Sequence, residues 1–206
     1  MPAQKRADVR VELIFEATEH AIANRGYDRV RFADVAAIAG VSIGSLQRRF
    51  GTLEALLRAT MKHVDARERD RWLDLARGID DPWDRLIALL RNVLALAHGD
   101  PEDQLWLQVL AVGQRDETLR SDLQTQQDLW TMTFTQVVAE GMANGQMTSD
   151  LTAREAGLAL LALTDGFYLA RHIGNTPPDI ETTGRIAETV ARCVLRRPEG
   201  RPMEGR

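Results

Sequence analysis

The stretch from Ala39 to Thr52, AGVSIGSLQRRFGT, combines small residues, hydroxyls, an amide and two adjacent arginines. Side chains of these kinds suit contact with a polyanion. Hydroxyls bond phosphates, an amide can address an adenine edge, and a guanidinium can pair bidentately with guanine or with phosphate. Gln47 and Arg48 are therefore candidates for base contacts, and Arg49 is a candidate for a phosphate contact.

The residues around these side chains predict a helix–turn–helix. Phe32–Ala39 has apolar residues at helical spacing, Gly40-Val41 turns the chain, and Ser42 can cap a second short helix. Small residues at Gly44 and Ser45 let that second helix approach a duplex closely. This geometry places one helix in a DNA major groove. Glycine turns also join helices in ordinary bundles, so the turn alone leaves that alternative open.

The rest of the chain also has a helical pattern, because Ala, Leu, Arg and Glu dominate and β-branched alternation is missing. Asp81-Pro82, Asp100-Pro101 and the capping box Thr152–Glu155 are helix start signals. We expect an all-α protein of about nine helices. Its expected parts are an N-terminal three-helix unit over residues 1–52, a helical body over 53–198 and a disordered tail over 199–206.

Composition and charge restrict the class of protein. The 206 residues carry a net charge of −4, but residues 1–63 are net +3 and the remainder is net −7. A mildly basic front end suggests local contact with an anionic surface. The lone Cys193 permits no internal disulfide, and no Cys/His cluster has metal-site spacing. We expect a cytoplasmic protein without metal or other cofactor. We expect no membrane segment, since the longest apolar run, 158–163, cannot span a bilayer.

A gapless motif extends over residues 14–56, and it consists of Ile14, Ala17, Gly26-Tyr27, Asp34-Val35-Ala36, Ala39-Gly40-Val41-Ser42, Gly44-Ser45-Leu46, Phe50 and Glu54-Ala55-Leu56. This motif resembles the N-terminal domain of the tetracycline-repressor (TetR) family. The resemblance implies a homodimeric transcription regulator, usually a repressor, that binds a palindromic operator. It also implies that the helices after residue 52 form a ligand-binding and dimerisation domain, in which a small effector releases the DNA.

The resemblance carries DNA-contacting roles onto the second helix of the helix–turn–helix, at Ser42, Ile43, Gly44, Ser45, Gln47 and Arg48. It adds flanking phosphate contacts at Arg31 and Thr52. Three positions depart from the family pattern. Arg31 stands where a capping Thr or Ser is usual, Gln47 where an aromatic residue is usual, and Leu53 where Lys is common. We therefore expect an unusual operator preference.

The last two long helices resemble the association surface of the family. On the last helix, apolar residues recur on one face, and glycines on the helix before it allow close approach. The expected dimer contacts are Gly157, Leu161, Gly166, Thr183, Ile186, Ala187, Val190 and Val194. The alternative is that this stripe is ordinary core.

Large apolar side chains with a few polar ones mark the helices that usually line the ligand cavity of the family. The expected pocket residues are Trp83, His98, Leu105, Trp106, Gln108, Val109, Gln127, Trp130, Phe134 and Phe167. Because the apolar faces carry few charges, we expect a largely apolar or aromatic effector. Aromatic residues at helical spacing are also common in cores, so that interpretation stays open.

Two other classes of protein are the alternatives to a regulator. An enzyme is not expected, because the chain lacks Glu-x-x-His pairs, a Gly-rich phosphate loop and a nucleophile elbow. A helical ligand-binding or scaffold protein that has lost DNA binding remains an alternative, since the family's usual aromatic residue and Lys are missing at Gln47 and Leu53.

Overall fold

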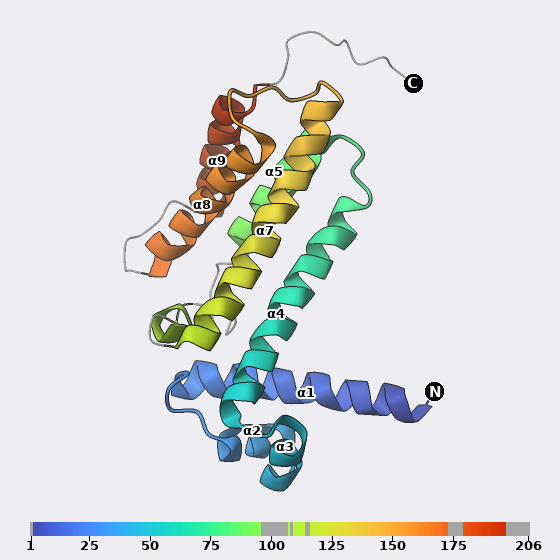
Figure 1. The fold of residues 1–206 in the computed structure, drawn as a ribbon, viewed down its shortest axis with the longest axis vertical. Coiled ribbons are helices and arrows are strands. Elements are labelled where there is room, and N and C mark those ends of the chain that lie inside the picture. Colours follow the sequence, from blue (N-terminus) through green and yellow to red (C-terminus); the bar gives the residue numbers. More distant parts are fainter. Residues whose placement is uncertain (1, 96–106, 108, 114–115, 173–178, 197–206) are drawn as a thin grey trace. The chain divides into compact units, whose positions relative to one another are not determined.

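A computed structural model describes residues 2–95, 107, 109–113, 116–172 and 179–196. Its helices are α1 (Pro2–Arg25), α2 (Phe32–Ala39), α3 (Ile43–Phe50), α4 (Leu53–Ala76), α5 (Pro82–Ala95), α7 (Glu117–Ala143), α8 (Ala153–His172) and α9 (Ile180–Val194) (Figure 1). Residues 109–113 are helical as well. The described part contains no strand beyond an isolated antiparallel bridge between Thr148 and Arg196, so the all-α prediction is confirmed.

Local sequence signals explain where several helices begin. The Asp81 carboxylate accepts from the backbone N–H of Trp83 at 2.8 Å, as expected for an Asp-Pro start. Thr152 and Glu155 form the predicted capping box: the Thr152 N–H donates to the Glu155 carboxylate at 2.8 Å, and the Glu155 N–H donates to the Thr152 hydroxyl at 3.3 Å. Helix α1 begins at Pro2.

The chain divides into two compact units by packing. Of the described residues, those up to 68 and those between 107 and 125 form the first unit. Those from 69 to 95 and from 126 to 196 form the second unit. Helices α4 and α7 each contribute residues to both units. The predicted division after residue 52 stays a prediction, and the predicted tail over 199–206 lies outside the described residues.

The core of the first unit includes residues from far along the chain. Ile22, Val35, Leu46 and Leu56 are essentially inaccessible to solvent and belong to the helix–turn–helix and its neighbours. Three buried residues from the later segment join the same cluster, and these are Val109, Leu119 and Leu123. Burial of apolar area stabilises this arrangement. The segment before and at the start of α7 is therefore part of the structure that holds the N-terminal helices.

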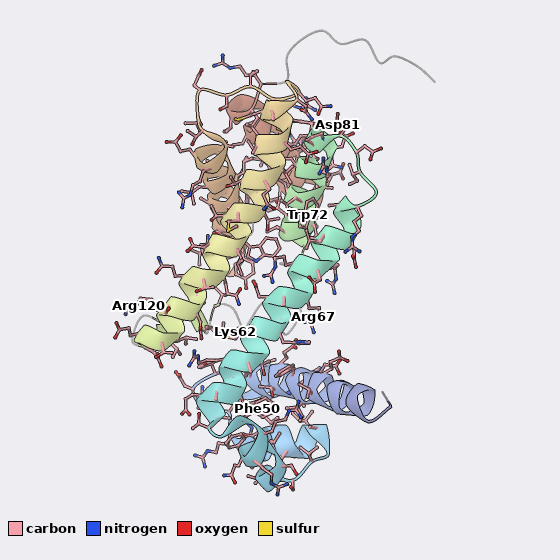
Figure 2. All side chains as sticks on the ribbon, turned by 45° about the vertical axis from the view of Figure 1, so that its right-hand side comes forward. Phe50, Lys62, Arg67, Trp72, Asp81 and Arg120 are labelled. Atoms are coloured by element: carbon pink, nitrogen blue, oxygen red, sulfur yellow. The ribbon has the colours of Figure 1, made fainter. Side chains whose placement is uncertain are left out.

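The second unit has its own core on α5, α7, α8 and α9, together with the end of α4 (Figure 1). Trp72, Trp83 and Phe134 are its largest fully buried side chains (Trp72 is labelled in Figure 2). Gly157 lets α8 approach α7 closely, because a β-carbon there would lie 2.9 Å from the Thr135 backbone nitrogen. No helix in the described ranges combines the length and apolarity needed to cross a bilayer.

Candidate nucleic-acid interface

Helices α2 and α3 are joined by a turn whose geometry is fixed by backbone contacts. Gly40 ends α2 in the left-handed region, with φ of 65° and ψ of 32°, a conformation that favours glycine. The Val41 N–H donates to the Ala36 carbonyl at 3.1 Å. The Ser42 hydroxyl then caps α3 by accepting from the Ser45 N–H at 3.2 Å. The predicted helix–turn–helix, including its cap, is therefore present.

Helix α3 has one buried face and one exposed face. Leu46 is fully buried, and Phe50 is partly buried with its ring centroid 6.1 Å from that of Phe15 on α1. All nine residues predicted to contact DNA are exposed in this structure: Arg31, Ser42, Ile43, Gly44, Ser45, Gln47, Arg48, Arg49 and Thr52. They lie on α3 or directly beside the ends of α2 and α4. Their contact with DNA stays a prediction.

The basic groups of α3 differ from three arginines of the first unit that form ion pairs with carboxylates. Arg25 pairs with Asp34 at 3.1 Å, Arg58 with Asp122 at 2.6 Å and Arg67 with Glu19 at 3.2 Å, whereas no ion pair links Arg48 or Arg49 to any residue of the described chain. The Arg49 guanidinium lies 6.0 Å from the ring centroid of its neighbour Phe50. The unit therefore keeps these two guanidinium groups uncompensated on the outward side of α3, where an anionic ligand could bind them.

Gly44 and Ser45 are small, so the outward side of α3 carries little side-chain bulk at these two positions. A β-carbon added to Gly44 meets no atom within 4 Å. The Ser42 and Ser45 hydroxyls lie 2.8 Å apart and bond each other. The glycine is therefore not required by packing inside the chain. Its small size matters for whatever approaches α3 from outside.

Capping hydrogen bonds also fix the starts of α4 and α2, the helices on either side of α3 in the sequence. The Thr52 hydroxyl accepts from the Ala55 N–H at 3.1 Å, so Thr52 caps α4. The Arg31 backbone N–H donates to the Asp34 carboxylate at 2.9 Å, which caps α2 from within its first turn. The Asp34 carboxylate thus satisfies the Arg31 N–H, which is a different donor from the one that a hydroxyl at Arg31 would bond, and the Arg31 side chain stays exposed.

Two family models match this chain. Residues 14–60 match the family described as "Bacterial regulatory proteins, tetR family". Residues 82–196, more than half of the chain, match "BetI-type transcriptional repressor, C-terminal". The chain belongs to the TetR family. The predicted resemblance is thereby confirmed, and the matches are to transcriptional regulators rather than to enzymes.

The similar proteins align with this TetR-family chain over nearly its whole length. The regulator named BetI from Burkholderia thailandensis is 29% identical over 200 residues, covering 95% of this chain and 98% of its own length. A TetR transcription regulator from Haloarcula marismortui shares the fold with a TM-score of 0.79 at 21% identity, covering 91% of this chain and 99% of that one. A transcriptional regulator from Saccharomonospora viridis, solved in complex with choline, has a TM-score of 0.80 at 24% identity, covering 93% and 100%.

The predicted pocket residues of this TetR-family chain that the structure describes belong to both units. Val109 belongs to the core of the first unit, whereas Trp83 and Phe134 are buried in the second core. Trp130 and Phe167 are partly buried, and the Gln127 amide donates to the Asp165 carboxylate at 3.0 Å. The remaining four predicted residues lie outside the described chain: His98, Leu105, Trp106 and Gln108.

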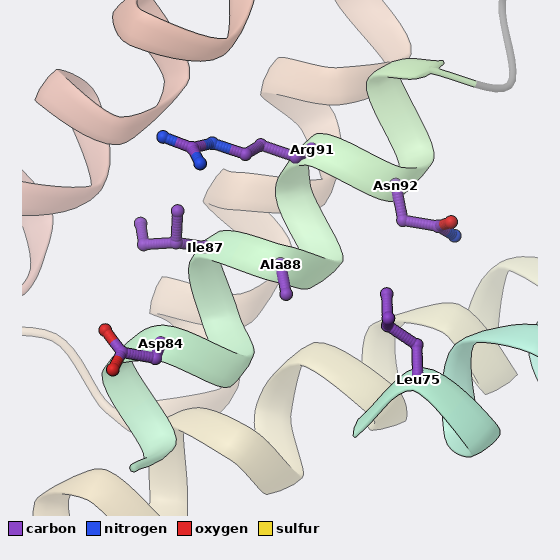
Figure 3. A pocket seen from close by; sticks show the side chains of 6 residues that line it. All are labelled: Leu75, Asp84, Ile87, Ala88, Arg91 and Asn92. Carbon is purple, nitrogen blue, oxygen red and sulfur yellow. The ribbon is translucent and has the colours of Figure 1, made fainter. Parts of the chain in front are cut away.

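A pocket of about 510 Å³ opens on the second unit between the end of α4 and α5 (Figure 3). It is lined by Leu75, Asp84, Ile87, Ala88, Arg91 and Asn92, none of which the sequence indicated. Arg91 on its rim pairs with Glu188 of α9 at 3.1 Å. The predicted ligand pocket therefore stays a prediction, and this outer pocket is a separate feature.

The predicted dimer residues are divided between core and surface. Gly157, Leu161, Thr183 and Ala187 are buried within the single chain, Ile186, Val190 and Val194 are partly buried, and Gly166 is exposed. Large apolar residues that the sequence did not single out are exposed on α8, and these are Leu158 at 43% and Leu169 at 49%. Their spacing relative to the buried positions could have indicated a second apolar face on α8.

Proposed function

We propose that this TetR-family repressor acts as a homodimer that presents two α3 helices to adjacent major grooves of a palindromic operator. The observation that carries the proposal is the uncompensated Arg48-Arg49 pair on the exposed face of a rigidly capped α3. Two-fold symmetry would set the helices about 34–36 Å apart, one turn of DNA. In this proposal Gln47 and Arg48 contact bases, and Arg31, Arg49 and Thr52 contact phosphates.

The proposed release mechanism uses a small effector bound by the helices after α4. The ligand must prefer the geometry that does not bind DNA, since equal affinity for both geometries shifts nothing. Coupling of about 1–3 kcal/mol would reduce operator affinity roughly 5–150-fold. The choline complex of the Saccharomonospora protein makes choline the first effector to test. Its methylated headgroup agrees in part with the apolar or aromatic effector expected from composition.

Operator binding is tested by a gel shift with purified protein on the DNA upstream of the protein's own gene. We expect specific binding that weakens steeply as salt rises, because phosphate contacts release counterions. A scaffold protein that has lost DNA binding would give no specific shift at any salt concentration. Addition of the true effector should release the shifted DNA, and unchanged operator affinity would contradict the proposed switch.

A further inference from the structure

Helix α3 keeps one of its three large apolar side chains in contact with water. Leu46 is fully buried and Phe50 packs against the core of the first unit, whereas Ile43 at the start of the helix is 42% exposed. Water contact with an aliphatic side chain is unfavourable, so a surface that covers Ile43 would gain binding free energy. Single exposed isoleucines are common on proteins, and the groups beside this one therefore decide its meaning.

The neighbour of Ile43 on the helix surface is the amide of Gln47. The two residues stand at the i, i+4 spacing, which places their side chains next to each other on an α-helix. Gln47 is exposed as well. No other part of the described chain covers this face, since a β-carbon added to Gly44 meets no atom within 4 Å. Helix α3 therefore presents an aliphatic group and an amide side by side.

The hydroxyl groups at the start of α3 are engaged within the protein. The Ser42 hydroxyl accepts from the Ser45 N–H at 3.2 Å, and the two hydroxyl oxygens bond each other at 2.8 Å. Both serines thus take part in capping α3. This leaves the Ile43 side chain and the Gln47 amide as the groups of this turn that can be given entirely to an outside partner.

An A·T base pair matches these two groups chemically. In the major groove adenine presents N7 and its amino group, which suit an amide, and thymine presents its 5-methyl group, which suits an aliphatic side chain. Four residues of helix correspond to about 6 Å along its axis. Successive bases on one strand of DNA lie about 3.4 Å apart, so neighbouring side chains one turn apart reach bases within about two base pairs of each other.

We propose that Ile43 determines operator specificity by covering the 5-methyl group of one thymine in each half-site, within about two base pairs of the adenine that Gln47 bonds. This inference rests on the proposed function, which gives Gln47 a base contact and gives Ile43 none. It also names what the half-site must contain, namely a thymine that is recognised by its methyl group rather than by a hydrogen bond.

A contact of Ile43 with the sugar–phosphate backbone, or a purely structural role, predicts a different result. In those roles loss of the side chain weakens binding whether or not the thymine carries its methyl group. Deoxyuridine separates the roles, because it pairs with adenine as thymine does and lacks only that methyl group. Ile43→Ala should leave the thermal midpoint of the protein unchanged, since Ile43 is exposed at the start of its helix.

The probe is the duplex that wild-type full-length protein enriches from a random DNA pool, with each symmetric pair of thymines replaced in turn by deoxyuridine. At one pair we expect wild-type affinity to fall about 15-fold, because each methyl group that is no longer covered is worth about fourfold. Ile43→Ala should bind the two duplexes equally, within about twofold, and Ile43→Val should retain most of the discrimination. Leu13→Ala is the matched control, since Leu13 is 52% exposed on α1, and it should keep the full difference.

Replacement of adenines by 7-deazaadenine locates the base that Gln47 bonds, because this base lacks the N7 acceptor. The adenine whose replacement weakens wild-type protein but not Gln47→Ala should lie within two base pairs of the sensitive thymine. A larger separation would overturn the assignment. So would a duplex with no sensitive thymine, or a deoxyuridine effect that persists in Ile43→Ala, which would mean that the methyl group acts through the shape of the DNA. In these cases the operator is still bound and the proposed function stands. If no sequence is enriched at all, the proposed function fails together with this inference.

Discussion

Asp122 in the first turns of α7 joins two basic residues of α4 within the first unit. Its Oδ2 accepts from Nε of Arg58 at 2.6 Å, and its Oδ1 lies 2.9 Å from Nζ of Lys62. The carboxylate is only 17% exposed. Burial by itself would raise the pKa of Asp122, but the hydrogen bonds from Arg58 and Lys62 outweigh it and lower that pKa below its usual range. The start of α7 is thus ionically fixed to the helix that follows α3.

Replacement of Asp122 by Asn should destabilise the fold by about 1–2 kcal/mol at pH 7, because the pair is partly sheltered and charge-assisted. A lowered pKa in the folded state means that the carboxylate contributes stability above its unfolded pKa and loses it as pH falls through the lowered value. The difference between wild type and variant should therefore shrink in acid. Denaturant unfolding at neutral and acidic pH measures it.

Asp74→Asn serves as the matched control, since the Asp74–Arg77 pair is exposed on both sides, at 66% and 78%. An exposed pair contributes little, so we expect a change within about 0.5 kcal/mol. Equal effects of the two substitutions at neutral pH, or an Asp122→Asn effect that does not depend on pH, would contradict the role given to Asp122.

Gly44→Ala should change stability and operator affinity in opposite directions. The added methyl group meets nothing in the chain, and alanine favours a helix over glycine by up to about 1 kcal/mol. If α3 approaches DNA closely, the same methyl group should weaken operator binding at least about tenfold, a cost of the size found for overpacking. Thermal unfolding and a binding isotherm on one preparation measure both quantities.

Gly40→Ala is the contrasting variant. Gly40 has a φ of 65°, which costs a residue with a side chain about 1–2 kcal/mol. We expect this variant to be less stable. Its operator affinity should fall only in proportion to the fraction of protein that is unfolded. A Gly44→Ala protein that binds the operator as tightly as wild type would argue against close approach of α3.

The features that the sequence predicted correctly are local ones. The Gly40 turn, the Ser42 cap, the Asp81 start and the Thr152–Glu155 box each depend on residues within a few positions of one another. Local rules of backbone conformation and capping are sufficient to place such features. The exposed face of α3 followed from the same short-range periodicity.

The features that the sequence did not predict depend on contacts between distant segments. Nothing local indicates that Val109 and Leu119 complete the core of the N-terminal helices, or that Leu161 is buried within its own chain while Leu158 is exposed. The Asp165 carboxylate accepts from the Gln127 amide, which lies 38 positions away in the sequence. Tertiary packing decides these points.

Leu158→Asp should disrupt the proposed dimer without unfolding the chain. Leu158 is 43% exposed on α8, so a charge there meets water in the monomer but would be buried against a second copy. We expect the dimer dissociation constant to rise at least about tenfold, with weaker operator binding because two linked α3 helices are needed. Analytical ultracentrifugation measures the association.

Leu73→Asp is its control, because Leu73 is similarly exposed, at 44%, but lies on α4. It should leave the sedimentation coefficient unchanged. If Leu158→Asp sediments as wild type does at every concentration, α8 is not the dimer surface.

Selection of duplexes from a random DNA pool tests the central claim most directly, namely that a dimer reads two half-sites with paired α3 helices. Purified wild-type protein should enrich one two-fold symmetric sequence, bound by two chains per duplex. Arg48→Ala should bind that sequence about 10–100-fold more weakly, because it loses one good base or phosphate contact per half-site. The variant should unfold at the same temperature as wild type. Failure to enrich any sequence, enrichment of an asymmetric site by a single chain, or undiminished binding by Arg48→Ala would contradict it.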